Sequence, residues 1–270
     1  MRDRNESKIN YQPTPQSHHT YTPPTDIVHF PSGGKFYPEG HPLHGKESVE
    51  AYFMTTKEED ILVNASYNKE GIVYDKLIGS ILVDKSIDVS SFLIGDKNAI
   101  LINARKNAYG PDYEVRISCE ECFSNNEISI DLNEVGNKDV DYSSVEVTPQ
   151  GTFLLELPKS EVKVELRLLD GQDEKEMANE AIQRVKHNLP EETVTGRYSR
   201  MVRSINGNTD PIFIKSFISN MPIMDSRLFR KTYLNIMPDI DFVYKFSCQE
   251  CGHTNKGGVP LTGNFFWPDE

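Results

Sequence analysis

Four cysteines are the residues of this chain whose type and spacing most clearly indicate chemistry. They form two Cys-x-x-Cys pairs, Cys119/Cys122 and Cys248/Cys251, and each pair has the form Ser-Cys-x-Glu-Cys after an alternating, strand-like segment. One tight Cys-x-x-Cys turn presents two thiolates, and two such turns supply the four tetrahedral sulfur ligands of a closed structural zinc site. The sequence therefore predicts one structural Zn2+ bound by Cys119, Cys122, Cys248 and Cys251.

Other uses of these cysteines are less favoured by the sequence. Disulfides are disfavoured because the polar start of the chain predicts no export signal, and the cytosol keeps thiols reduced. A redox Cys-x-x-Cys normally opens a helix that lowers the thiol pKa, whereas both pairs here lie in turns flanked by strand-like segments. An Fe–S cluster, or four thiols without metal, stays open as an alternative.

Motifs for enzyme catalysis are not found in the sequence. The triplet Gly33-Gly34-Lys35 lacks the spacing of a phosphate-binding loop, and no G-x-S-x-G or H-E-x-x-H motif occurs. His253 follows the second cysteine pair, where an exposed turn residue is more typical than a substitute metal ligand. The acidic pairs Glu58-Glu59 and Glu191-Glu192 suit helix starts. We expect no catalytic residues, no cofactor besides zinc and no small-molecule substrate.

Charge and composition exclude two classes of partner. The formal net charge is −12, and nucleic-acid binding needs clustered Lys and Arg. Arg197, Arg200 and Arg203 are spaced as on the solvated side of a helix. No charge-free apolar run approaches the roughly 18 residues that a membrane span needs. We therefore expect a soluble cytosolic protein that binds neither nucleic acid nor membranes.

The elements that must position the cysteines follow from capping signals and periodicity. Residues 1–26 are polar and rich in proline, which predicts a disordered arm before a single domain over residues 27–270. Helical spacing or capping predicts helices at residues 56–68 (capping box Thr56/Glu59), 72–83, 97–108 (N-cap Asp96), 172–187 (N-cap Asp170), 193–205, 211–219 and from Asp225 to Pro238.

Alternating apolar residues predict the strands. They occur at residues 49–53, 113–118, 127–132, 152–157 and 162–169, and strand character returns in residues 239–270. The aromatic cluster Phe265-Phe266-Trp267 is expected to dock the end of the chain on the core. The predicted fold class is α+β, with a helical body, β-hairpins and a zinc-ribbon-like unit. Because its two Cys-x-x-Cys knuckles are distant in sequence, the metal would join an early hairpin to the C-terminal segment.

A series of short motifs resembles a known family. The motifs, in order, are FPSGGKFYP (residues 30–38), MTTKEED (54–60), GDKNAIL (95–101), YGP (109–111), NGNTD (206–210) and FFWP (265–268). Their order resembles baseplate hub subunits and hub assembly proteins of T4-like tailed phages, over nearly everything after residue 27. The cysteine pairs match the zinc-binding segments expected of such relatives, and the arm before Ile27 is an addition to them.

The resemblance implies a non-enzymatic protein of contractile-tail assembly with phage baseplate hub or tail proteins as partners. The leading hypothesis is an assembly factor or chaperone that acts in the host cell cytoplasm and contacts its partners through helices. The alternative is a minor structural hub subunit retained in the tail baseplate of the virion. A zinc or redox enzyme is the less favoured third class, and the resemblance transfers no catalytic residues.

Overall fold

The computed structural model describes residues 21–190, 193–259 and 265–266, so the predicted arm lies outside the described residues up to residue 20. Strand β1 (Thr25–His29) begins two positions before the expected start at Ile27. It pairs antiparallel with β2 (Ser48–Tyr52), with Val28 opposite Val49. A loop with several turns joins the two strands, as the Pro-Ser-Gly-Gly sequence predicts.

The first helices differ from the single helix predicted for residues 56–68. The chain forms α1 (Thr56–Leu62) and α2 (Ala65–Glu70), because the side chain of Asn64 accepts hydrogen bonds from two backbone N–H groups and caps a second helix. The predicted capping box is also wrong by one residue. The carboxylate of Glu58 accepts from the backbone N–H of Thr55 at 3.0 Å.

The third and fourth helices belong to the N-terminal lobe, which comprises residues 21–109. Helix α3 (Val73–Ile81) buries its predicted apolar stripe, and a short 3-10 turn (Val89–Ser91) leads to α4 (Ile94–Tyr109). Four α-helices therefore precede the first cysteine, where the sequence predicted three. Asp96 is not the N-cap of α4. It is buried in the first turn, where its carboxylate accepts hydrogen bonds from Ser32 and Tyr37.

The second lobe comprises residues 132–241. It contains a four-stranded antiparallel sheet in the order β5-β6-β7-β8. Strands β6 (Phe153–Leu157) and β7 (Val162–Leu166) form the predicted hairpin, and β5 (Glu146–Val147) extends one edge. Strand β8 (Val202–Ile205) corrects the predicted helix over residues 193–205. Val202, Ser204 and Ile205 pair with β7 and are buried there, and the exposed Arg203 lies at a register shift.

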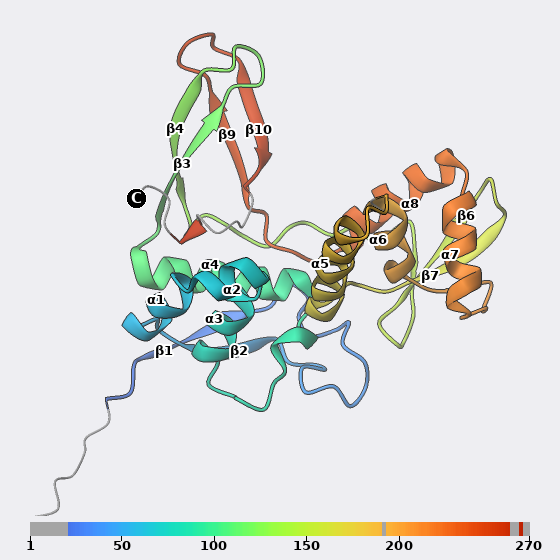
Figure 1. The fold of residues 1–270 in the computed structure, drawn as a ribbon, viewed down its shortest axis with the longest axis horizontal. Helices are drawn as coiled ribbons and strands as arrows, with labels where there is room; N and C mark the ends of the chain where they lie inside the picture. The colour runs from blue at the N-terminus through green and yellow to red at the C-terminus, as the bar shows by residue number, and fades with distance from the viewer. Residues whose placement is uncertain (1–20, 191–192, 260–264, 267–270) are drawn as a thin grey trace, which may run out of the picture.

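The second lobe also contains four helices, two between β7 and β8 in the chain and two after β8 (Figure 1). They are α5 (Gly171–Lys186), α6 (Thr193–Met201), α7 (Pro211–Asn220) and α8 (Ile223–Ile236). Asp170 caps α5 as predicted, and its carboxylate accepts from the backbone N–H of Asp173 at 2.9 Å. Asp225 does not precede α8 but lies within its first turn. It is fully buried there and accepts two backbone N–H bonds from the β6–β7 turn.

Two β-hairpins project from the helices on the same side of the molecule (Figure 1). Strands β3 (Asp112–Ser118) and β4 (Asn125–Asp131) form the first hairpin, and β9 (Val243–Ser247) and β10 (Thr254–Gly258) form the second. The strands alternate exposed and more buried residues, as the period-2 pattern predicts. The hairpins lie at the two ends of the chain segment that builds the second lobe.

The end of the described chain packs into the core, as the aromatic cluster predicted. Phe265 and Phe266 are 0% and 1% exposed, and the carbonyl of Phe265 accepts a hydrogen bond from Arg105 of α4. The predicted stripe of α5 is less buried, because Ile182 and Val185 near its C-terminal end are exposed. Among the described helices, none combines the length and apolar character that crossing a membrane requires.

Candidate metal centre

The four cysteines that the sequence predicts as zinc ligands lie together at the turns of the two projecting hairpins. One potential ligand sulfur from each residue contributes to a cluster in which all four Sγ atoms lie within 4.8 Å of one another. The distance from Cys119 Sγ to Cys251 Sγ is 3.7 Å, and that from Cys122 Sγ to Cys248 Sγ is 3.6 Å. Both close contacts join one hairpin to the other, so the cluster is the point where the hairpins are linked.

The same local turn presents the cysteines in both hairpins. The carbonyl of Cys119 accepts from the N–H of Phe123 at 3.0 Å, and the carbonyl of Cys248 accepts from the N–H of Gly252 at 2.9 Å. The residue after the second cysteine is in the left-handed region in each case, with φ of 59° at Phe123 and 73° at Gly252. In both turns the first cysteine is buried and the second is exposed.

A buried asparagine from the first hairpin supports the cysteine turn of the second. Asn126 of β4 is 4% exposed. Its Oδ1 accepts a hydrogen bond from the backbone N–H of Gln249 at 3.1 Å, and its Nδ2 donates to Cys248 Sγ at 3.7 Å. One amide side chain therefore fixes the partner turn and also stabilises negative charge on the Cys248 sulfur.

The second hairpin returns the same pair of contacts. Asn255 of β10 is 1% exposed. Its Oδ1 accepts from the N–H of Glu120 at 2.9 Å, and its Nδ2 donates to Cys119 Sγ at 3.5 Å. The sequence reasoning missed both asparagines. A signal was present, since each one follows the first cysteine of its pair by the same number of positions.

The hydrogen bonds around the cluster favour thiolates at the two buried cysteines. The hydroxyl of Ser124 and the backbone N–H of Cys251 lower the pKa of the Cys248 thiol to about 5. The backbone N–H of Cys122 is the main cause that lowers the pKa of Cys119. At Cys251 a backbone N–H also lowers the pKa, but the neighbouring thiols outweigh it and raise the pKa to about 12.

Negative charges on four sulfurs this close together repel one another, and a bound cation would relieve that repulsion. The spacing fits such a cation. A tetrahedral ion with Zn–S bonds of about 2.3 Å places its sulfurs about 3.8 Å apart, close to the two measured separations. A disulfide needs about 2.05 Å between sulfurs, and all four cysteines are free. An all-sulfur donor set also disfavours Mg2+ and Ca2+, which prefer oxygen.

His253 does not join this group of potential ligands, which consists of the four cysteines. It is exposed in the turn after Cys251, and its backbone carbonyl accepts the N–H of Cys248 at 2.8 Å. The prediction of an exposed turn residue is therefore confirmed.

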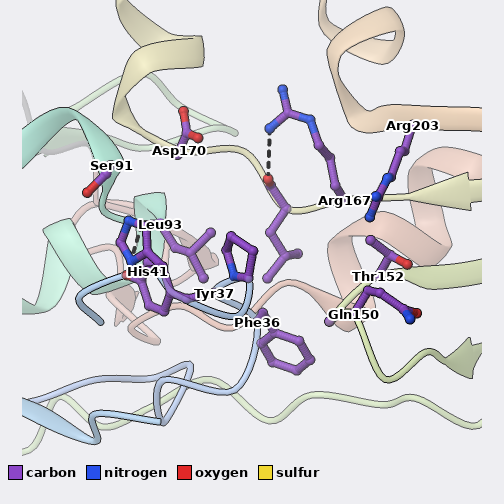
Figure 2. A pocket seen from close by; sticks show the side chains of 13 residues that line it. Phe36, Tyr37, His41, Ser91, Leu93, Gln150, Thr152, Arg167, Asp170 and Arg203 are labelled. Carbon is purple, nitrogen blue, oxygen red and sulfur yellow. Dashed lines mark hydrogen bonds between the residues drawn. The ribbon is translucent and has the colours of Figure 1, made fainter. Parts of the chain in front are cut away.

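A separate pocket of about 430 Å3 lies between the β1–β2 loop and the second lobe. Figure 2 shows Tyr37 and His41 on one side of it and Arg167 and Arg203 on the other. The polar groups of these four residues already form hydrogen bonds or ion pairs with other residues of the protein. Arg167 forms a two-pronged ion pair with Asp173 at 2.6 and 2.8 Å, and Nδ1 of His41 accepts a backbone N–H. Burial lowers the pKa of His41, which favours this neutral form.

Comparison with known proteins identifies the family. The model of a family described as T4 bacteriophage base plate protein matches residues 26–267. No curated protein and no solved structure gives a significant match. The family match covers both cysteine pairs and both lobes, and the motifs noted in the sequence lie within it or end one residue beyond it. The chain therefore belongs to the T4 bacteriophage base plate protein family.

Proposed function

We propose that this protein acts in the assembly of the base plate hub of a contractile phage tail, as a non-enzymatic assembly factor or chaperone. Membership of the base plate family is the observation that carries this proposal. It also supports other phage base plate proteins as the partners. The host cell cytoplasm, where tails are built, is then the place of action.

The second part of the proposal is one structural Zn2+ bound by Cys119, Cys122, Cys248 and Cys251. The all-sulfur donor set, the separations of 3.6 and 3.7 Å, and the hydrogen bonds to the buried sulfurs support it. The ion would hold together the two hairpins that begin and end the segment forming the second lobe. Such a link orders two short hairpins, each of which is marginally stable alone.

The chemistry of the polar groups favours a binding protein over an enzyme. Four thiolates complete a tetrahedral shell and leave no position for a metal-bound water. The ionisable groups that face the pocket of Figure 2 are engaged by the fold, with Arg167 on Asp173 as the clearest case. We therefore assign the zinc to stability, and we expect neither nucleic acid nor a small-molecule substrate as a partner.

Quantitative mass spectrometry of purified virions tests the assignment to assembly. A factor that leaves after assembly is absent from virions, and deletion of its gene stalls the hub. A stoichiometric amount in purified tails would instead identify a structural hub subunit retained in the particle. Normal tails from the deletion phage would contradict both forms of the proposal.

A further inference from the structure

The tip of the first hairpin carries an exposed aromatic side chain in a strained conformation. Phe123 follows Cys122 directly, is 78% exposed and has a φ of 59°. A bulky side chain is disfavoured in this left-handed region because its Cβ approaches the backbone. Burial in the folded chain cannot explain the choice of phenylalanine, because the ring faces solvent.

The second hairpin shows which residue the turn itself prefers. Gly252 occupies the equivalent position after Cys251, with a φ of 73°. Both turns make the same backbone hydrogen bond, at 3.0 Å for Phe123 and 2.9 Å for Gly252. The turn can thus be made with glycine and without strain. A residue kept in a costly conformation with no internal contact to justify it points to a function outside the fold.

The surroundings of Phe123 are acidic. Glu120, Glu121 and Glu250 are exposed in the two cysteine turns. No Lys or Arg occurs in residues 119–125 or 248–255, which together form these turns. The tip therefore combines one large apolar group with three exposed glutamates, at the end of the molecule farthest from the helices (Figure 1).

We propose that this tip is a docking surface, and that Phe123 inserts into an apolar pocket rimmed by Lys and Arg on another base plate protein. The inference deepens the proposed function and rests on it. An aromatic anchor at the centre of an interface typically carries much of the binding free energy. Acidic groups around it select a basic partner and accelerate its association.

The geometry of the cluster suits this role. The turn that holds Phe123 is fixed by the Cys119 carbonyl and by Asn255 of the opposite hairpin, whose Oδ1 accepts the N–H of Glu120. A side chain held in its binding conformation loses little conformational entropy when it docks. The sequence-based hypothesis placed the contact surface on helices, whereas the tip offers a surface built by the cysteine turns.

Binding measurements with defined proteins test the proposal. The probes are the individually purified base plate proteins of the phage that encodes this chain, and the ligand is the full-length zinc-loaded protein on a biosensor. The variants are Phe123→Gly, Phe123→Trp and the double variant Glu120→Gln/Glu121→Gln. The matched control is Ile212→Ser, which removes an apolar side chain that is 80% exposed on α7. Zinc content and melting temperature confirm that each variant is folded.

The parent is expected to bind one base plate protein, and Phe123→Gly to weaken that binding at least tenfold. Phe123→Trp, which keeps an aromatic side chain, is expected to bind like the parent. The double variant Glu120→Gln/Glu121→Gln should make the affinity depend less on salt concentration. Ile212→Ser should leave the affinity unchanged. Parent-like binding by Phe123→Gly would overturn the tip proposal and leave the proposed function standing. A parent that binds none of the base plate proteins would overturn the proposed function and the tip proposal together. A parent that binds only its own second copy would overturn the tip proposal.

Discussion

Removal of the Asn126 side chain should destabilise the linked hairpins by an amount that the structure allows us to work out. Asn126→Ala loses two neutral hydrogen bonds, one from the N–H of Gln249 and one to the carbonyl of Ser124, and one bond to the Cys248 sulfur. A neutral bond contributes about 1 kcal/mol and a bond to a charged group about 1.5–3 kcal/mol. Two neutral bonds and one bond to a charged sulfur therefore give an expected loss in the free energy of unfolding of about 4 kcal/mol, a large part of the stability of an ordinary domain.

Denaturation by guanidinium chloride, followed by circular dichroism, measures this loss on the zinc-loaded full chain. Asn133→Ala is the matched control, because Asn133 is exposed in the turn after β4, and surface substitutions change stability by less than about 0.5 kcal/mol. Asn255→Ala should have an effect of similar size to that of Asn126→Ala, since its three contacts, with Glu120, Cys119 and His253, are equivalent.

Removal of the metal provides a second check on the same reasoning. In the metal-free protein the pKa of the Cys248 thiol is about 5, so the charged part of the Asn126 interaction is kept at neutral pH and is lost when the pH falls below that value. Below that pH the difference between the metal-free parent and Asn126→Ala should fall to about 2 kcal/mol, the value of two neutral hydrogen bonds. Equal unfolding midpoints for Asn126→Ala and Asn133→Ala with zinc present would refute the interpretation of Asn126 as a support of the partner turn.

Three further substitutions have defined outcomes. Cys248→Ser should remove the bound zinc and cost several kcal/mol, because structural zinc binding is coupled to folding; a melting curve like that of the parent would contradict this. Gly95→Ala places a Cβ 2.1 Å from the Pro238 carbonyl oxygen, so urea unfolding should show a loss of about 1–3 kcal/mol in the free energy of unfolding. The control is Gly79→Ala, whose Cβ meets only an ordinary contact at 3.5 Å and should not destabilise the protein. Burial raises the pKa of Glu58, but hydrogen bonds from nearby hydroxyls outweigh it and lower the net pKa. The ionised carboxylate therefore stabilises the fold above its ordinary pKa of 4.5, and this stability is lost as the pH falls through the lowered value. Glu58→Gln should flatten that part of the acid-unfolding profile, and an unchanged profile would disprove the assignment.

Local patterns in the sequence were sufficient to predict the cysteine site and most strands. A Cys-x-x-Cys turn and a period-2 strand are each encoded within a few neighbouring residues, so the β3–β4 and β9–β10 hairpins could be predicted directly. The two asparagines could not be assigned in the same way. The partner of Asn126 lies in the other hairpin. The sequence around each hairpin does not indicate that the two hairpins form hydrogen bonds with each other.

The aspartates near helix starts show a second limit of sequence reasoning. Asp96 and Asp225 precede apolar helical segments, which is also the pattern of an N-cap. In the fold both are buried acceptors that fasten a distant loop to the helix, through Ser32 for Asp96 and the β6–β7 turn for Asp225. Likewise, Val202–Ile205 becomes a strand only because β7 offers an unpaired edge, which helical periodicity cannot reveal.

The measurement that tests the central claim most directly is the metal content of the full chain, purified under reducing conditions, together with a titration of its thiols. The account predicts one zinc ion per chain and four thiols that react only after chelation. Protection should include Cys122 and Cys251, because both are exposed in the folded protein and accessible to a thiol reagent unless a metal binds them. A protein with reactive thiols and no zinc, or with a disulfide that cycles freely between these cysteines, would contradict the account.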